Sequence, residues 1–267
     1  MTDTEPGLRK INGIVGFFDI LGYASFMERN SDIDAIAEVF QTINGIRPEM
    51  KKVLQESFNR LPEPNGDPVI KFVDELQLVV FSDTILVIAT FPEPDVGRAQ
   101  YALTHVIACA ILSRRMFESG LPLRGSINTG EIFVQENCFA GQAIISAYND
   151  SRELNLAATI VHDDVLKAFD GFPADWQRTK VLGSHFVQKY PAPLKSGQSA
   201  RVNIVNFVGI YENGPRIDPD VRQWVARAFW GHKKEIGPDA YAKLFNTEML
   251  CRFLLEYAPS RPPKLSD

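Results

Sequence analysis

Apolar and polar positions group along the chain into blocks that predict a mixed α/β domain. Residues 11–20 form an apolar run that predicts a buried strand ending at Asp19. Apolar residues at helical spacing predict one helix beginning near residue 31 and a second over 48–61. The Pro- and Gly-containing stretch 62–68 indicates a loop before the next block.

The following block predicts three strands, the last two joined as a hairpin. Residues 69–73 and 76–81 look extended, and 84–91 is a β-branched apolar run. The dipeptide Ser82-Asp83 is a turn signal, so Asp83 is expected at the hairpin tip. Residues 97–119 carry apolar side chains on one helical face, and Gly120 is placed to end that helix.

The remainder of the chain completes an α/β (α+β) pattern. Residues 123–134 predict a pair of strands, 141–158 a helix, and 219–230 and 238–257 two further helices. The order β-α-α-β-β-α-β is that of a ferredoxin-like sandwich. We therefore expect a domain over residues 1–210 with a helical extension over 211–267 that packs on the same domain.

Composition narrows the possible functions. The 267 residues are 45% hydrophobic, which is enough for one large core. The net charge is −5 and no basic patch is visible, so a nucleic-acid partner is disfavoured. No apolar run reaches the roughly 20 residues that a membrane-spanning helix needs. The start of the chain is polar without a signal peptide, and Cys109, Cys138 and Cys251 form no CxxC, so we expect a reducing cytoplasm.

Two aspartates at the ends of apolar runs are the main candidates for chemistry. Asp is a favoured turn residue, so two solvated turn carboxylates are the structural alternative. In the expected topology the first strand and the hairpin are neighbours, which places Asp19 and Asp83 at one edge of the sheet. Two carboxylates there would suit a hard divalent cation and its phosphates. The backbone amides of Leu21, Gly22 and Tyr23 would add a phosphate cradle.

Four segments, in this order, resemble the class III nucleotidyl cyclases. Residues 17–23 (FFDILGY) resemble their FxDIxGF segment, and 81–84 (FSDT) resemble their second metal motif, with Ser82 where Gly is usual. Residues 123–131 (LRGSINTGE) resemble their xRxGIxxG strand, and 141–147 resemble the start of their GxxVNxAxR helix. The resemblance covers about residues 11–158 and, more loosely, the later strands.

This resemblance implies a head-to-tail homodimer that cyclises a nucleoside triphosphate at the dimer interface. It implies two divalent ions, Mn²⁺ or Mg²⁺, bound by the Asp19 and Asp83 side chains and the Ile20 backbone carbonyl. The ribose 3′-oxygen would attack the α-phosphorus and pyrophosphate would leave, so that metals and cations dominate catalysis. Arg124 is the best cationic candidate, with a strand-edge salt bridge as its structural alternative. Lys189 and Lys195 are further candidates between which the sequence does not choose.

The chain departs from the family pattern at the residues that read the base and at those that stabilise the transition state. Val79 stands where adenylyl cyclases carry a base-reading Lys, and Cys138 where they carry an Asp. Neither side chain can make those hydrogen bonds. The transition-state Asn and Arg of the family align with Ile145 and Asn149. A cyclase for another base, a degenerate homologue that only binds nucleotide, and a false alignment all remain open.

Five segments look like the pyrimidine cyclases of bacterial anti-phage Pycsar systems: 17–23, 123–131, 140–148, 189–197 and 243–255. This resemblance implies a uridylate cyclase that makes 3′,5′-cyclic UMP and pyrophosphate from UTP as a messenger for an effector protein. A cytidylate cyclase acting on CTP, a catalytically silent nucleotide-binding homologue and an unrelated metal-dependent phosphohydrolase are the alternatives. The expected catalytic residues are Asp19, Asp83 and Arg124, and the expected substrate contacts are Phe18, Ile20, Leu21, Gly22, Tyr23, Val79, Cys138 and Asn149.

Overall fold

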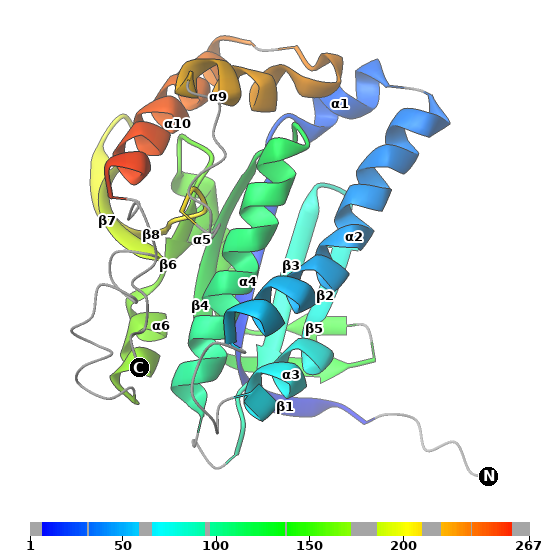
Figure 1. Cartoon of the computed structure of the whole chain (residues 1–267), viewed down its shortest axis with the longest axis vertical. Helices are drawn as coiled ribbons and strands as arrows, with labels where there is room; N and C mark the ends of the chain where they lie inside the picture. The colour runs from blue at the N-terminus through cyan, green and yellow to red at the C-terminus, as the bar shows by residue number, and fades with distance from the viewer. Residues whose placement is uncertain are drawn as a thin grey trace.

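The computed structural model describes residues 7–30, 32–58, 66–93, 97–136, 138–171, 186–209, 220–235 and 237–257, with the backbone alone for 53–58, 66–70 and 257. They form one eight-stranded sheet with helices on both faces (Figure 1). The strands are β1 (Arg9–Ile20), β2 (Gln77–Phe81), β3 (Thr84–Thr90), β4 (Leu123–Gln135), β5 (Cys138–Ala140), β6 (Thr159–Val161), β7 (Val187–Pro193) and β8 (Ser199–Val205). The helices are α1 (Tyr23–Arg29), α2 (Ile33–Phe58), α3 (Gly66–Glu75), α4 (Arg98–Glu118), α5 (Gln142–Glu153), α6 (Asp163–Ala168), α9 (Val221–Trp230) and α10 (Pro238–Tyr257), with 3-10 turns η1 (Phe169–Gly171) and η2 (Gly231–Lys233).

The strand order confirms the expected fold class. The sheet runs β2-β3-β1-β4-β6-β8-β7, and β5 pairs with β4 outside this path. β1 is antiparallel to both β3 and β4, whereas β4 and β6 are parallel. The four strands β2-β3-β1-β4, with helical connections after β1 and after β3, have the order of a ferredoxin-like sandwich. β6, β8 and β7 extend that core sheet on the β4 side.

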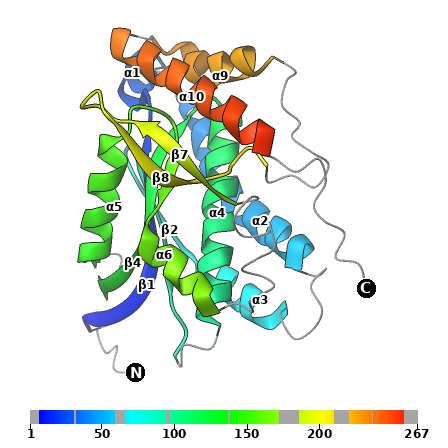
Figure 2. The same cartoon turned by 90° about the vertical axis from the view of Figure 1, so that its left-hand side faces the viewer.

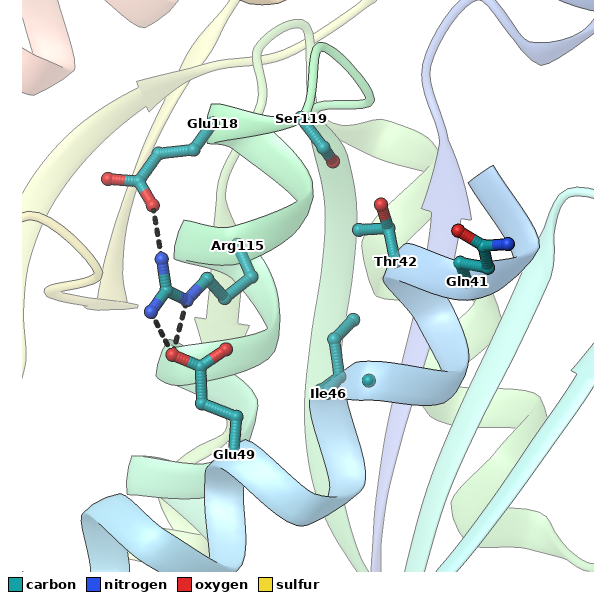
Figure 3. A pocket seen from close by; sticks show the side chains of 8 residues that line it. Gln41, Thr42, Ile46, Glu49, Arg115, Glu118 and Ser119 are labelled. Atoms are coloured by element: carbon teal, nitrogen blue, oxygen red, sulfur yellow. Dashed lines mark hydrogen bonds and ion pairs between the residues drawn. The ribbon is translucent and has the colours of Figure 1, made fainter. Parts of the chain in front are cut away.

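The helices form layers on the two faces of the sheet. Figure 2 shows α2, α3 and α4 on one face and α5 on the other. Nearly every residue of α4 is buried, because α2 and α3 cover the side that faces away from the sheet. His105 in α4 is fully buried, and its Nε2 lies 2.9 Å from the Val87 carbonyl oxygen.

Three predictions about elements are wrong. Residues 69–73 belong to α3 rather than to a strand, and Phe72, Val73 and Leu76 bury their side chains at helical spacing. The two helices predicted from residue 31 to 61 are one helix, α2, with Pro48 inside it. The predicted pair of strands over 123–134 is the single strand β4, in which Asn128 pairs with Val15. Of the predicted loop 62–68, residues 66–68 also belong to α3, and residues 62–65 lie outside the described residues.

The C-terminal helices α9 and α10 confirm the two helices predicted there. They pack with β6, β7 and β8 in a second hydrophobic cluster. Trp224 is buried in it, with its ring centroid 4.5 Å from that of Phe117, whereas Trp230 is largely exposed and contacts Tyr241. Residues 210–219 lie outside the described residues, so the domain boundary at 210/211 stays a prediction. No helix in the described part of the chain combines the length and apolar character needed to cross a membrane.

Candidate active site

Asp19 and Asp83 lie next to each other where β1 and the β2–β3 hairpin end. Asp19 is paired with Thr84 across the β1–β3 ladder. The Ile20 backbone N–H donates to the Asp83 carbonyl oxygen at 2.9 Å. The Asp19 side chain is 24% exposed, and Asp83 is also partly exposed. The two carboxylates therefore share one edge of the sheet and remain accessible there.

The turn that presents Asp83 has a backbone conformation that suits glycine. β2 and β3 pair up to Phe81 and Thr84, which leaves Ser82 and Asp83 as a two-residue turn. Ser82 has a φ of 55°, whereas the φ of Asp83 is not positive. A positive φ at only the first central residue is the pattern of type II′ hairpin turns, where Gly is preferred. This explains why glycine is usual at this position in the motif that the hairpin resembles.

Arg124 lies opposite Asp19 on β4 and pairs with its side chain. The Arg124 Nη2 donates to Asp19 Oδ2, and Nη1 donates to the Leu154 carbonyl oxygen at 3.3 Å. The Arg124 side chain is only 9% exposed, and its Nε has no hydrogen-bond partner among the described residues. A Cβ on the adjacent Gly125 would lie 2.5 Å from Phe18 Cδ1, so glycine is needed for the Phe18 ring to pack against β4. The ion pair that we considered as the structural alternative is thus present.

Much of the expected phosphate cradle is engaged within the protein. The side chains of Phe18, Ile20 and Leu21 are buried in the core. The Ile20 N–H donates to Asp83 and the Leu21 N–H donates to the Pro122 carbonyl oxygen at 2.9 Å. Gly22 has a φ of 79° and precedes α1, which begins at Tyr23. Of the predicted cradle amides, those of Gly22 and Tyr23 remain as candidates.

The aspartates fit a hard divalent cation. No group of three or more His, Cys, Asp or Glu that could hold a metal occurs in the ranges that the structure describes. A metal at this edge would therefore rely on the Asp19 and Asp83 carboxylates, a backbone oxygen and the substrate. That ligand set matches how Mg²⁺ is commonly bound, through one or two carboxylates plus substrate phosphates. The guanidinium of Arg124 would compete with such an ion for Asp19.

Three other predicted substrate contacts lie on separate elements. Val79 is half-buried on the edge strand β2, opposite Leu86. Cys138 has an exposed thiol at the start of β5, and Asn149 is exposed on α5. In the described part of the chain, none of the three makes a hydrogen bond or ion pair with the two aspartates or the arginine. Their roles in binding the base or the ribose stay predictions.

A polar contact between α5 and β4 was not predicted from the sequence. Asp150 Oδ2 accepts hydrogen bonds from Asn128 Nδ2 at 3.2 Å and from Ser126 Oγ at 3.4 Å. Ser126 and Asn128 are fully or almost fully buried and two residues apart on β4, so they face the same side of the strand. Buried polar groups need partners, so this spacing was a signal for an acceptor on the covering helix.

The neighbouring side chains of α5 are engaged with each other. Tyr148 packs against Phe17 with ring centroids 5.3 Å apart. Arg152 Nη1 donates to the Tyr148 hydroxyl oxygen at 2.7 Å, and the guanidinium lies over the ring.

Of the two candidate lysines, Lys195 is the one near Arg124. It lies in the turn between β7 and β8, and its backbone N–H donates to the Glu153 carbonyl oxygen at 2.9 Å. Partial burial lowers the pKa of Lys195, and the positive charges of Arg124, Lys243 and Arg152 lower it further, whereas Asp19 raises it. Lys189 is exposed on β7.

Searches for relatives return structures but no sequence family. No family model and no curated protein matches this chain. Among solved structures, the chain is similar to the catalytic core of a rhodopsin-guanylyl cyclase with converted specificity in complex with ATPαS, with 15% identity, a TM-score of 0.44 and coverage of 77% of this chain and 98% of the other. It is also similar to the adenylyl cyclase CyaB from P. aeruginosa, with 12% identity, a TM-score of 0.42 and coverage of 74% and 95%. A third similar structure is the guanylate cyclase domain of RhGC from Catenaria anguillulae in complex with GTP. The identity is 15% and the TM-score 0.42, with coverage of 74% of this chain and 97% of the other. Because the identities and TM-scores are low, these likenesses assign no activity to this chain.

Proposed function

We propose that this chain is a class III-type nucleotidyl cyclase that converts UTP to 3′,5′-cyclic UMP and pyrophosphate. One observation carries the proposal: Asp19 near the end of β1 and Asp83 in the β2–β3 turn, the two residues of the metal motifs, lie together where the Ile20 N–H donates to the Asp83 carbonyl oxygen. The end of β1 and the adjacent hairpin turn bring two acidic oxygen ligands to one place, as metal-assisted phosphoryl transfer requires.

The residues of this edge have separate roles in the proposed reaction. Asp19 and Asp83 would hold the divalent ions, which lower the pKa of the ribose 3′-hydroxyl and neutralise phosphate charge. Arg124 is close enough to Asp19 to pair with it, and its guanidinium suits a phosphate oxygen. Gly22 and Tyr23 would contribute backbone amides to the phosphates. Buried Phe18 and Leu21 fix the strand end that presents Asp19.

The choice of a pyrimidine rests on what replaces the purine-reading residues. Val79 offers an apolar wall on β2 and Cys138 offers a thiol, neither of which can bind the adenine edge as Lys and Asp do. The resemblance to the Pycsar pyrimidine cyclases points to uracil, and CTP is the second substrate to be tested. In that setting the cyclic nucleotide would act in anti-phage defence by activating an effector.

We further propose that the active unit is a homodimer with its sites at the interface. The side chain of Phe81, the residue before the Asp83 turn, is 80% exposed. Ile145, on the outer side of α5, is 52% exposed. The dimer is what the resemblance to the class III cyclases implies, and a partner over these positions would bury the two apolar side chains. Sedimentation of the purified protein would test the dimer, and a monomer at all concentrations would contradict it.

The decisive experiment is incubation with each of the four nucleoside triphosphates and Mn²⁺, followed by chromatography of the products. We expect cyclic UMP and pyrophosphate from UTP or, failing that, cyclic CMP from CTP. Product from ATP alone would rule out the pyrimidine assignment, and orthophosphate without a cyclic product would indicate a phosphohydrolase. Absence of any product would leave a silent nucleotide-binding homologue.

A substitution of Asp83 tests whether this residue holds the metal. Asp83→Asn keeps the size of the side chain and removes its charge, so we expect turnover to be abolished with thermal unfolding unchanged. Asp34→Asn, at an exposed position of α2, is the matched control and should retain full turnover. Near-normal turnover of Asp83→Asn would show that Asp83 does not hold the catalytic metal.

A further inference from the structure

The segment that follows α5 joins three distant parts of the chain beside Asp19. Arg124 from β4 donates to the Leu154 carbonyl oxygen at 3.3 Å. The turn between β7 and β8 attaches through Lys195 N–H to the Glu153 carbonyl oxygen and through a bridge between Leu154 and Leu194. Residues 153–157 therefore fix Lys195 relative to the arginine that pairs with Asp19.

The C-terminal helix α10 attaches to the same segment. Thr247 Oγ1 accepts a hydrogen bond from the Ala157 N–H at 2.8 Å, and Asn246 Nδ2 donates to the Asn155 carbonyl oxygen at 2.9 Å. Lys243 precedes these residues by three and four positions, so it lies on the same side of α10. Thr247 Oγ1 also donates to the Lys243 carbonyl oxygen at 2.7 Å, which ties the two turns of the helix together.

The cations gathered here outnumber the acids: of the four, Arg124 is the one that pairs with Asp19. The positive charges of Arg124, Lys243 and Arg152 lower the pKa of Lys195. Asp19 is the one acidic group that raises it. Within the described residues, neither the Lys195 nor the Lys243 ammonium group has a hydrogen bond or an ion pair. Positive charges held together in excess of their counter-charges are costly, and a chain with a net charge of −5 has acids that could have neutralised them. The arrangement therefore suits an anion with several charges.

We propose that α10 is part of the substrate site, because Lys243 joins Arg124 and Lys195 in one binding site for an oligophosphate. The ligand is inorganic pyrophosphate or the β- and γ-phosphates of a nucleoside triphosphate. The proposal deepens the proposed cyclase function, since a cyclase must bind this group in its substrate and release it as product. It gives the C-terminal helix a direct role in binding, which a purely structural extension would not have.

The first test measures binding of inorganic pyrophosphate by calorimetry in the presence of EDTA, so that no metal contributes. We expect Lys243→Gln to raise the Kd about tenfold, as for the loss of one charged contact. Lys243→Arg should stay within about threefold of the parent, because it keeps the charge. The control Lys10→Gln removes one positive charge at the far end of β1, where Lys10 pairs with Glu131, and should leave the Kd unchanged. A Kd of Lys243→Gln equal to that of Lys10→Gln would overturn the proposal.

A second test needs no variant and therefore does not depend on the folding of one. Surface lysines of the parent protein are acetylated with and without pyrophosphate, and peptides are quantified by mass spectrometry. Pyrophosphate should protect Lys195 and Lys243 and leave Lys10 equally reactive. Equal reactivity of Lys243 in both samples would contradict its place in the site.

The outcomes separate this inference from the cyclase proposal. If no triphosphate is cyclised but Lys243→Gln weakens pyrophosphate binding, the oligophosphate site stands and the cyclase proposal fails. If UTP is cyclised while Lys243→Gln binds both UTP and pyrophosphate as the parent does, the cyclase proposal stands and α10 has no role in binding.

Discussion

The ion pair between Arg124 and Asp19 should contribute measurably to stability as well as to the site. The perturbation that tests this is Arg124→Met, which keeps most of the buried aliphatic chain and removes the guanidinium. The variant loses the contact to Asp19 Oδ2 and the 3.3 Å hydrogen bond to the Leu154 carbonyl oxygen. It also removes the Nε, which is buried without a partner.

The expected magnitude follows from these contacts. A hydrogen bond to a charged group contributes about 1.5–3 kcal/mol, and the lower part of that range applies because water still reaches the 24% exposed Asp19. Removal of the unsatisfied Nε offsets about 1 kcal/mol of the loss. The lost hydrogen bond to Leu154 adds to the cost, so the net destabilisation is about 1–2 kcal/mol. For a chain of this size that lowers the Tm by about 2–6 °C.

The assay is urea unfolding of four proteins: the parent, Arg124→Met, Asp19→Asn and the double variant. The double-mutant cycle isolates the pairwise energy, for which we expect about 1 kcal/mol. A coupling energy within about 0.3 kcal/mol of zero, the usual error of additivity, would refute the reasoning. The same four proteins can be titrated with Mn²⁺, and Arg124→Met should bind it no more weakly than the parent because the competing guanidinium is gone.

Three further predictions concern single residues. Ser82→Gly should raise the free energy of unfolding by about 0.5–1 kcal/mol, measured in urea, because Gly adopts the 55° φ without strain. Burial lowers the pKa of His105 to about 4, so the unfolded chain binds a proton that the folded chain does not between about pH 6.5 and pH 4. Stability should therefore fall as the pH decreases through this window, and His105→Gln should lose less over it in matched urea titrations. Burial also lowers the pKa of Lys234 to about 8, so stability should rise with pH from about 8 towards 10.5, and a Lys234→Met variant that rose equally would contradict this.

The sequence predicted the elements whose signals are local. The apolar run ending at Asp19 and the turn at Ser82-Asp83 locate β1 and the β2–β3 hairpin, because strand periodicity and turn chemistry act over a few residues. The strand predicted at 69–73 failed because a short apolar run does not distinguish a strand from one side of a helix. The helix α2 runs through Pro48, where the local signal for a break was overridden by packing of the helix against α4.

The features of the candidate site also divide into those set by local sequence and those set by tertiary packing. By itself the sequence determined that Asp19 and Asp83 end apolar strands and that Arg124 lies on a later strand, since each of these facts depends only on neighbouring residues. Only the tertiary structure decided that Arg124 pairs with Asp19, that Lys195 rather than Lys189 lies beside them, and that Lys243 joins them from α10. The physical reason is that periodicity reports which face of an element is buried, whereas the meeting of residues 19, 124, 195 and 243 depends on how distant elements pack together.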